Sequence, residues 1–164
     1  MSTPHPPHGL DITPLSGASE ERACAALMAA SDPWQTLGYG YDDLLRTVQL
    51  PGRERYVAHA QGQFAGFLLL NLHGTFAGYI QTIGLVPEFR GRGHGEALVA
   101  FAEQRIWRDH RNVFLCVSSF NLAARRFYGR LGYVQVGELA DFLVEGHSEL
   151  LLRKTTGPLR ERKA

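Results

Sequence analysis

An apolar stretch that stops at a proline and continues into a glycine-rich loop most constrains how this chain can fold. Residues 83–86 read as the end of a strand, Pro87 ends it, and a helical pattern begins near Gly93. Such a loop leaves backbone N–H groups at the positive end of a helix, where the missing Cβ atoms let an anion approach the main chain. The pattern predicts a turn that binds a diphosphate.

Two common phosphate loops do not fit this stretch. The P-loop needs a lysine followed by serine or threonine, whereas the chain has His94, Gly95 and Glu96. The dinucleotide fingerprint needs two residues between its second and third glycines, but the glycines here alternate with other residues, and no early βαβ unit surrounds them. The remaining pattern is Arg-x-x-Gly-x-Gly, which Arg90, Gly93 and Gly95 satisfy.

A second motif lies in residues 121–133, Asn-Leu-Ala-Ala-Arg-Arg-Phe-Tyr-Gly-Arg-Leu-Gly-Tyr. Asn121 and Tyr128 are seven residues apart, so about two helical turns place them on one face. Alone, the motif also fits a helix-capping asparagine and a packing tyrosine. Together with the Arg90 loop it resembles the GNAT superfamily of acyl-CoA N-acyltransferases. The resemblance covers roughly residues 10–155 and is strongest over residues 79–133.

Hydrophobic periodicity and turn residues predict the order of the elements. These are a strand at 10–15, a helix at 19–29 capped by Ser19, a helix at 41–50, strands at 55–60, 64–72 and 76–86, a helix at 93–110, a strand at 113–118, a helix at 121–131, and strands at 133–139 and 147–154. Short glycine turns predict that the three middle strands form an antiparallel meander. The strand–helix–strand order that follows predicts one parallel pair, made through a right-handed crossover.

We therefore expect an α/β (mixed α+β) fold of the GNAT type, with a central mixed sheet and flanking helices. One acetyltransferase domain is expected over residues 10–155, between disordered segments at 1–9 and 156–164. Hydrophobic residues are 45% of the chain, charged residues 20%, and the formal net charge is +1. This balance is typical of a globular protein and argues against a dedicated nucleic-acid binder.

The two cysteines, Cys24 and Cys116, form neither a disulfide framework nor a metal-binding pattern, so no metal is expected. The longest apolar run, residues 64–70, is too short to cross a bilayer. Residues 1–9 lack the apolar core of a signal peptide. We expect a cytoplasmic protein with no membrane partner, either a monomer or a homodimer.

The resemblance implies direct transfer of an acetyl group from acetyl-CoA to an amine. It assigns backbone groups of Ile83, Gly84 and Leu85 to the pantetheine arm, with one N–H polarising the thioester carbonyl. Asn121 is assigned to the pantetheine arm as well, and Tyr128 to protonation of the departing CoA thiolate. The residues assigned to the pyrophosphate are Arg90, Gly91, Arg92, Gly93, His94, Gly95 and Glu96.

The general base is where this chain departs from relatives that carry a glutamate on a central strand. Residues 55–87 contain no acidic residue, and Cys116 stands where some relatives have the acid. The remaining candidates are water held by Ser118 or Ser119, the histidines at 59, 73 and 147, and the loop carboxylates of Asp141 and Glu145.

The acceptor is expected to enter opposite the donor, beside the loops at 32–39 and 140–145. Trp34, Tyr39 and Phe142 are the candidates for an apolar wall, and Asp32, Asp141 and Glu145 for attraction of a cationic amine. Trp34 fits equally well as a lid over the core. The main alternative function is a non-catalytic acyl-CoA sensor or interaction module of the same fold. A third possibility is a longer acyl donor, limited by bulk near Phe67, Leu69 and Ile83.

Overall fold

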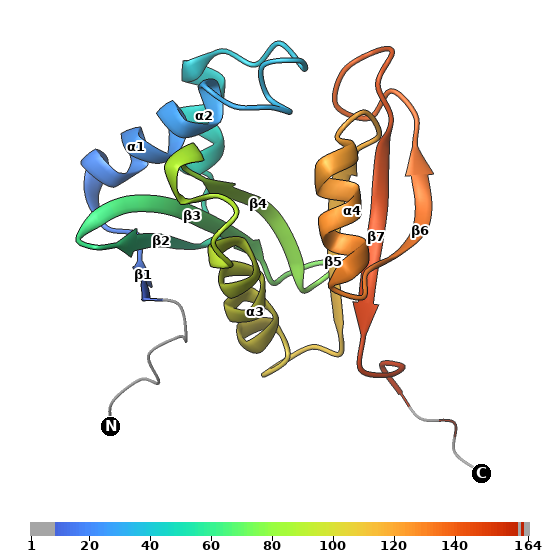
Figure 1. Cartoon of the computed structure of the whole chain (residues 1–164). Coiled ribbons are helices and arrows are strands. Elements are labelled where there is room, and N and C mark those ends of the chain that lie inside the picture. Colours follow the sequence, from blue (N-terminus) through green and yellow to red (C-terminus); the bar gives the residue numbers. More distant parts are fainter. Residues whose placement is uncertain (1–8, 161, 163–164) are drawn as a thin grey trace, which may run out of the picture.

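The computed structural model describes residues 9–160 and 162, and in them seven strands form one mixed sheet with helices on both faces (Figure 1). The strand order is β1-β2-β3-β4-β5-β7-β6, and only the β4–β5 pair is parallel. In chain order the elements are β1 (Leu10–Pro14), α1 (Gly17–Ala29), α2 (Tyr41–Val48), β2 (Glu54–Ala60), β3 (Gln63–Asn71), β4 (Tyr79–Leu85), η1 (Pro87–Phe89), α3 (His94–Ile106), β5 (Asn112–Ser118), α4 (Leu122–Arg130), β6 (Val134–Leu139) and β7 (Glu149–Thr155). The predicted fold class is confirmed.

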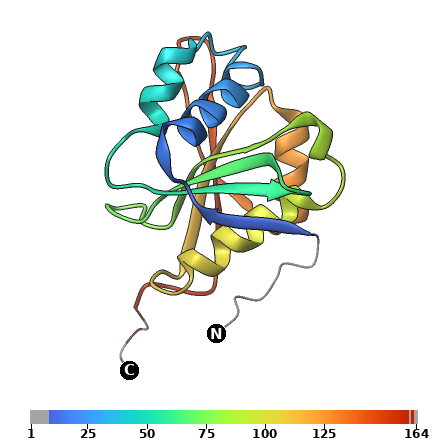
Figure 2. The same cartoon turned by 90° about the vertical axis from the view of Figure 1, so that its left-hand side faces the viewer.

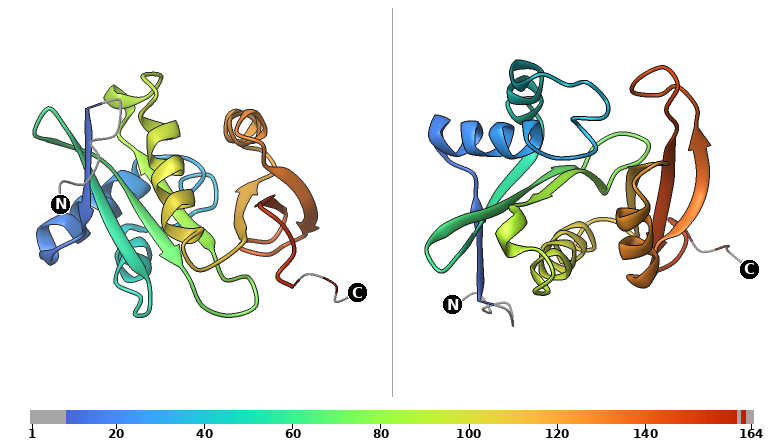
Figure 3. Two further views of the ribbon diagram at one scale, coloured as in Figure 1. Left: turned by 90° about the horizontal axis from the view of Figure 1, so that it is seen from below. Right: turned by 45° about the horizontal axis from the view of Figure 1, so that its top comes forward.

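The helices divide between the two faces of the sheet. Helices α1 and α2 cover one face, and α3 and α4 lie on the other, as the view from below makes plain (Figure 3). Strand β3 lies between these layers. Its Phe67 and Leu69 pack toward α1 and α2, while Leu68 and Leu70 pack toward α3 and α4. This double burial explains why β3 is continuously apolar rather than alternating.

Strand β1 forms one edge of the sheet and faces the viewer in Figure 2. Pro14 near its end lacks an N–H, which suits the edge position predicted for it. Of the helices in the described part of the chain, none has the length and apolar character needed to cross a bilayer.

Strands β4 and β5 pair only at their beginnings, through Tyr79↔Phe114 and Ile80↔Leu115. Beyond these pairs the two strands diverge toward the top of Figure 1, although β4 continues to Leu85 and β5 to Ser118. The register between β3 and β4 shifts at Leu70↔Ile80 and Leu69↔Thr82, which makes Gln81 the extra residue of a bulge. A bulge bends its strand and raises the local twist, so it favours this divergence.

Several predicted boundaries are corrected by the structure. Helix α1 begins at Gly17 and is capped by Ser16 rather than Ser19, because the Glu20 carboxylate accepts the Ser16 N–H at 2.6 Å. Helix α3 ends at Ile106 rather than near residue 110, because the chain turns there to enter β5. Strand β4 begins at Tyr79 rather than residue 76, since Gly78 has a φ of 89° that extended backbone does not adopt.

The terminal segments are described only in part. Of the predicted N-terminal segment 1–9, residues 1–8 lie outside the described residues. At the start of the segment 156–164, the Thr156 N–H donates to the carbonyl oxygen of Arg111 at 2.9 Å.

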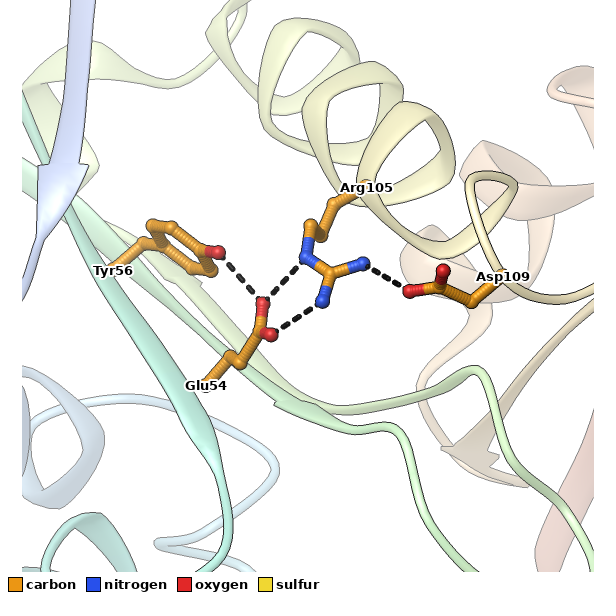
Figure 4. Close-up of polar contacts among 4 residues, drawn as sticks. All are labelled: Glu54, Tyr56, Arg105 and Asp109. Carbon is orange, nitrogen blue, oxygen red and sulfur yellow. Dashed lines mark hydrogen bonds and ion pairs between the residues drawn. The ribbon is translucent and has the colours of Figure 1, made fainter.

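A network of charged side chains ties α3 to the sheet (Figure 4). Arg105 of α3 donates to both oxygens of Glu54 in β2, at 2.8 and 2.5 Å, and also to Asp109 at 2.9 Å. The Tyr56 hydroxyl donates to the same Glu54 carboxylate at 2.7 Å. The network fixes the C-terminal end of the helix whose other end carries the glycine-rich loop.

Candidate functional site

A cleft of about 1610 Å³ runs through the molecule where β4 and β5 diverge. The two sequence motifs meet in it, although they are separated by some thirty residues of chain. Most of the site residues predicted from the sequence lie in its wall. These are Ile83, Gly84, Leu85, Arg90, Gly91, Gly93, Gly95, Glu96, Asn121 and Tyr128, together with Trp34, Tyr39 and Phe142.

Three predicted site residues lie outside the cleft wall. Arg92 is exposed and does not line it. His94 is buried, its ring 6.0 Å from that of Phe89, and its Nδ1 has no hydrogen-bond partner among the described residues. The Asp141 carboxylate accepts the Gly146 N–H at 2.7 Å, which shapes the β6–β7 loop.

The glycine-rich loop has the backbone geometry that its composition predicts. Gly91 has a φ of 70° and Gly93 a φ of 81°, conformations that L side chains rarely adopt. Gly93 is the N-cap of α3, so the free N–H groups of the first helical turn begin beside the cleft. The Arg90 Nε donates to the Leu85 carbonyl at 2.9 Å, so this arginine braces the end of β4. This wall of the cleft suits a phosphate.

The second motif forms α4 and places two polar groups in the cleft. Asn121 caps the helix through its Oδ1, which accepts the Ala124 N–H at 3.1 Å. Tyr128 is buried, with its ring 5.1 Å from Phe127 and 5.6 Å from Tyr133. Burial raises the pKa of Tyr128 well above its ordinary value, so the phenol keeps its proton at neutral pH.

A buried carboxylate that sequence analysis did not select also lines the cleft. Glu149 opens β7 directly opposite Ser118 of β5 and is 4% exposed. The Ser118 hydroxyl donates to Glu149 Oε1 at 2.5 Å. Burial raises the pKa of Glu149, and the hydrogen bond from Ser118 and the nearby His147 oppose that rise. One signal was available in the sequence: an acidic residue directly precedes the apolar run 150–152, at the start of a buried strand.

Only some of the base candidates predicted from the sequence line the cleft. Ser118 and His73 line the cleft, and the remaining predicted candidates do not. Those remaining candidates are His59, Ser119, Asp141, Glu145 and His147. Cys116 also lines the cleft, but burial raises the pKa of its thiol, so the thiol stays protonated at neutral pH.

The wall formed by the α1–α2 loop and the β6–β7 loop is largely apolar. Trp34 and Tyr39 are partly buried against the core beneath α1 and α2. Phe142 and Leu143 of the β6–β7 loop form an exposed rim, with exposed fractions of 57% and 45%. Exposed apolar side chains gathered at one opening are typical of a binding site.

Acidic groups at the cleft are few in the described part of the chain: Asp32, Glu96 and Glu149. The Asp32 carboxylate already accepts hydrogen bonds from the backbone and hydroxyl of Thr36, at 3.2 and 2.7 Å. Residues 9–160 and 162 contain no group of three or more histidine, cysteine or acidic side chains arranged to hold a metal ion.

Comparison with known proteins gives a consistent result. The family model described as the acetyltransferase (GNAT) family matches residues 20–133. An uncharacterized N-acetyltransferase of Methanocaldococcus jannaschii is 31% identical over 110 residues, which span 63% of this chain and 70% of that protein. The structure resembles the ribosomal-protein-S18-alanine N-acetyltransferase of Escherichia coli, with a TM-score of 0.73 and 14% identity over 94% of this chain and 99% of that one. It also resembles an aminoglycoside 6'-N-acetyltransferase complexed with coenzyme A, with a TM-score of 0.71 and 17% identity over 92% and 99% of the two chains.

Proposed function

The chain belongs to the GNAT family of acetyltransferases, and from this membership we propose that it moves the acetyl group of acetyl-CoA directly onto a primary amine, with Tyr128 as the general acid. The family is one of acetyl-CoA-dependent N-acetyltransferases, so the donor follows from membership. The rest of the proposal depends on the divergence of β4 and β5, which opens a cleft between the glycine-rich loop and Tyr128.

The donor is proposed to lie along this cleft with its pyrophosphate at the start of α3. The positive φ of Gly91 and Gly93 supports this, because it turns the chain so that helix N–H groups begin at the cleft wall. The part of β4 beyond Ile80 is no longer paired with β5, so its backbone groups can pair with pantetheine amides as an added strand. The Leu85 carbonyl is already used by Arg90, which favours the groups of Ile83 and Gly84 for this pairing.

The acid role proposed for Tyr128 needs a phenol that still carries its proton at neutral pH. Burial raises the pKa of Tyr128 above the ordinary phenol value of about 10, so the phenol stays protonated and can donate a hydrogen bond to the departing sulfur. A CoA thiolate with a pKa of about 8.5 is a weaker base than a tyrosinate, so complete proton transfer also depends on the tyrosinate being reprotonated. A non-catalytic sensor has no need of a hydroxyl on this packing ring, which favours an enzyme.

The acceptor is proposed to enter between the α1–α2 loop and the β6–β7 loop. The apolar rim supports a primary amine carried on an apolar body, either a small molecule or a protein N-terminus. A polycation is less favoured, because the cleft offers few carboxylates among the described residues and Asp32 is already engaged.

Calorimetry with coenzyme A and the substitution Gly93→Ala tests the donor site. Alanine at a φ of 81° costs about 1–2 kcal/mol of unfolding free energy and adds a Cβ at the phosphate turn, so coenzyme A should bind at least tenfold more weakly. Gly62→Ala is the matched control, because Gly62 has a similar φ of 73° in the β2–β3 turn, outside the cleft. It should lose similar stability and keep its affinity. Failure of the unmodified protein to bind coenzyme A would refute the proposed function.

A further inference from the structure

We propose that Glu149, positioned by Ser118, is the group that takes the proton from the acceptor amine. The inference rests on the proposed function and adds the missing base to it. It starts from the pairing of these two residues, at the end of β5 and the start of β7, where both line the cleft.

The alternation of side chains places this carboxylate across the sheet from the acid. Val117 of β5 and Leu150 of β7 belong to the core that contains Tyr128, on the α3–α4 face. Ser118 and Glu149 are the next residues along each strand, so their side chains point to the opposite face, which carries α1 and α2. A thioester held between β4 and β5 therefore has the phenol on one side and the carboxylate on the other. This arrangement suits direct attack, because the amine can approach from the carboxylate side while the phenol lies on the side of the departing sulfur.

Only one oxygen of the Glu149 carboxylate accepts a hydrogen bond from the described residues. The Ser118 hydroxyl donates to Oε1 at 2.5 Å, and none of the described residues donates to Oε2. The other titratable groups that face it are His147 from the preceding loop, Cys116 of β5 and Tyr79 of β4. Burial raises the pKa of both Cys116 and Tyr79, and the negative charge of Glu149 adds to the rise, so neither group competes with Glu149 as a base near neutral pH.

The proton inventory of the reaction balances with these two residues. An acceptor ammonium passes one proton to Glu149, and the freed lone pair forms the C–N bond to the acetyl carbonyl carbon while the carbonyl π pair moves onto oxygen. That pair then re-forms the C=O bond, the C–S bond breaks with its electron pair on sulfur, and sulfur takes the phenolic proton of Tyr128. The nitrogen gives up its second proton, which restores Tyr128 through solvent. Glu149 releases to solvent the single net proton that the reaction produces.

His73 is the other titratable base candidate in the cleft wall, and its position is less suited. It lies in the exposed β3–β4 turn, where its backbone N–H donates to Asn71 Oδ1 at 3.2 Å. Glu149 instead starts from a buried site whose raised pKa strengthens it as a base.

The test is the pH profile of kcat/KM for Glu149→Gln, with Glu138→Gln as control. The glutamine keeps the shape of the side chain and can still accept from Ser118, whereas Glu138 is exposed on the neighbouring strand β6 outside the cleft. The assay uses phenethylamine, a primary amine on an apolar body, and it also follows hydrolysis of acetyl-CoA, since attacking water must lose a proton too. Loss of the base is expected to lower kcat/KM by about 10²–10⁴-fold at neutral pH. The loss should shrink at high pH, where the amine is already neutral.

The pH profile of the variant Ser118→Ala is a second, independent test. The hydrogen bond from Ser118 lowers the pKa of Glu149, so removing it should move the acidic limb of the wild-type profile to higher pH, a shift that a purely structural serine would not cause. An unchanged acidic limb in both variants would overturn the assignment of Glu149. If the wild type itself neither binds coenzyme A nor consumes acetyl-CoA, the proposed function fails instead.

Discussion

Tyr128 shows how one side chain serves both packing and proposed chemistry. Its ring contacts Phe127 and Tyr133 within the core beneath α3 and α4, while the residue also lines the cleft. The sequence left two interpretations open, a packing tyrosine or an acid. The structure makes it a packing tyrosine that also reaches the cleft, so the two interpretations are compatible.

Replacement of Tyr128 by phenylalanine separates the two roles. The ring still packs, so the thermal midpoint and the affinity for coenzyme A should stay nearly unchanged. The turnover number should fall by about 10²–10⁴-fold, because the thiolate must then leave without a proton donor. Tyr41→Phe removes an exposed hydroxyl as the control. Equal turnover of Tyr128→Phe and wild type would remove Tyr128 from the acid role.

Among the elements, α3 is held at both ends: its start lines the cleft at the proposed donor site, and its end is anchored to the sheet. Leu98, Ala102 and Ile106 are fully buried on its inner side. At its last turn Arg105 binds Glu54 of β2 in a fork, which gives geometric specificity that a single lysine contact lacks (Figure 4).

The substitution Glu54→Gln should reduce stability in a pH-dependent way. Burial raises the pKa of Glu54, but hydrogen bonds from Arg105 and Tyr56 outweigh it and leave the pKa below its usual value. A lowered folded-state pKa stabilises the protein above the unfolded value near 4.3, and this stabilisation is lost as the pH falls through the folded value. The deficit should be about 1 kcal/mol at pH 7, since the pair is partly exposed, and should shrink as the pH falls below about 4.3 toward 3.

Urea unfolding of wild type and variant at both pH values measures this deficit. Asp43→Asn, which breaks the exposed pair with Arg46 on α2, is the control and should change stability little. A constant deficit across the pH range would mean that packing, rather than charge, links Glu54 to α3.

At the scale of the whole molecule, the sheet divides the cleft into the side proposed for the donor and the side proposed for the acceptor. The α3–α4 face provides the glycine-rich loop and Tyr128, and the α1–α2 face provides Trp34, Tyr39 and the Ser118–Glu149 pair. The divergence of β4 and β5 connects the two sides without breaking the sheet, because β4 stays paired with β3 and β5 with β7.

Substitution of Trp34 by alanine tests the acceptor side. If Trp34 contacts the apolar body of the amine, the KM for phenethylamine should rise about tenfold to a hundredfold, the equivalent of about 1.5–3 kcal/mol of lost apolar contact. The affinity for coenzyme A should not change. Trp107→Ala removes a tryptophan at the end of α3, outside the cleft, and serves as the control. Unchanged KM values in Trp34→Ala would make Trp34 a lid over the core.

Several features were predictable from the sequence because they depend on neighbours in the chain. The positive φ of Gly93, the stop of α4 before Gly132 and the alternation of strands and helices all arise from local backbone preferences and short-range periodicity. The cap of α1 was misplaced by three residues. Ser16 is the N-cap although its side chain makes no capping hydrogen bond, and its N–H instead donates to the Glu20 carboxylate four residues on.

Sequence alone determined that this chain has a strand, a glycine-rich turn and a helix in succession, and that Asn121 and Tyr128 belong to one helical segment, which Asn121 caps. Only the tertiary structure decided that β4 and β5 separate after Ile80, and that β7 inserts beside β5 so that Glu149 meets Ser118. The physical reason is the range of the interactions. Turns and helix caps form between residues a few positions apart, whereas strand order and register depend on burial shared by segments some thirty residues apart in the chain.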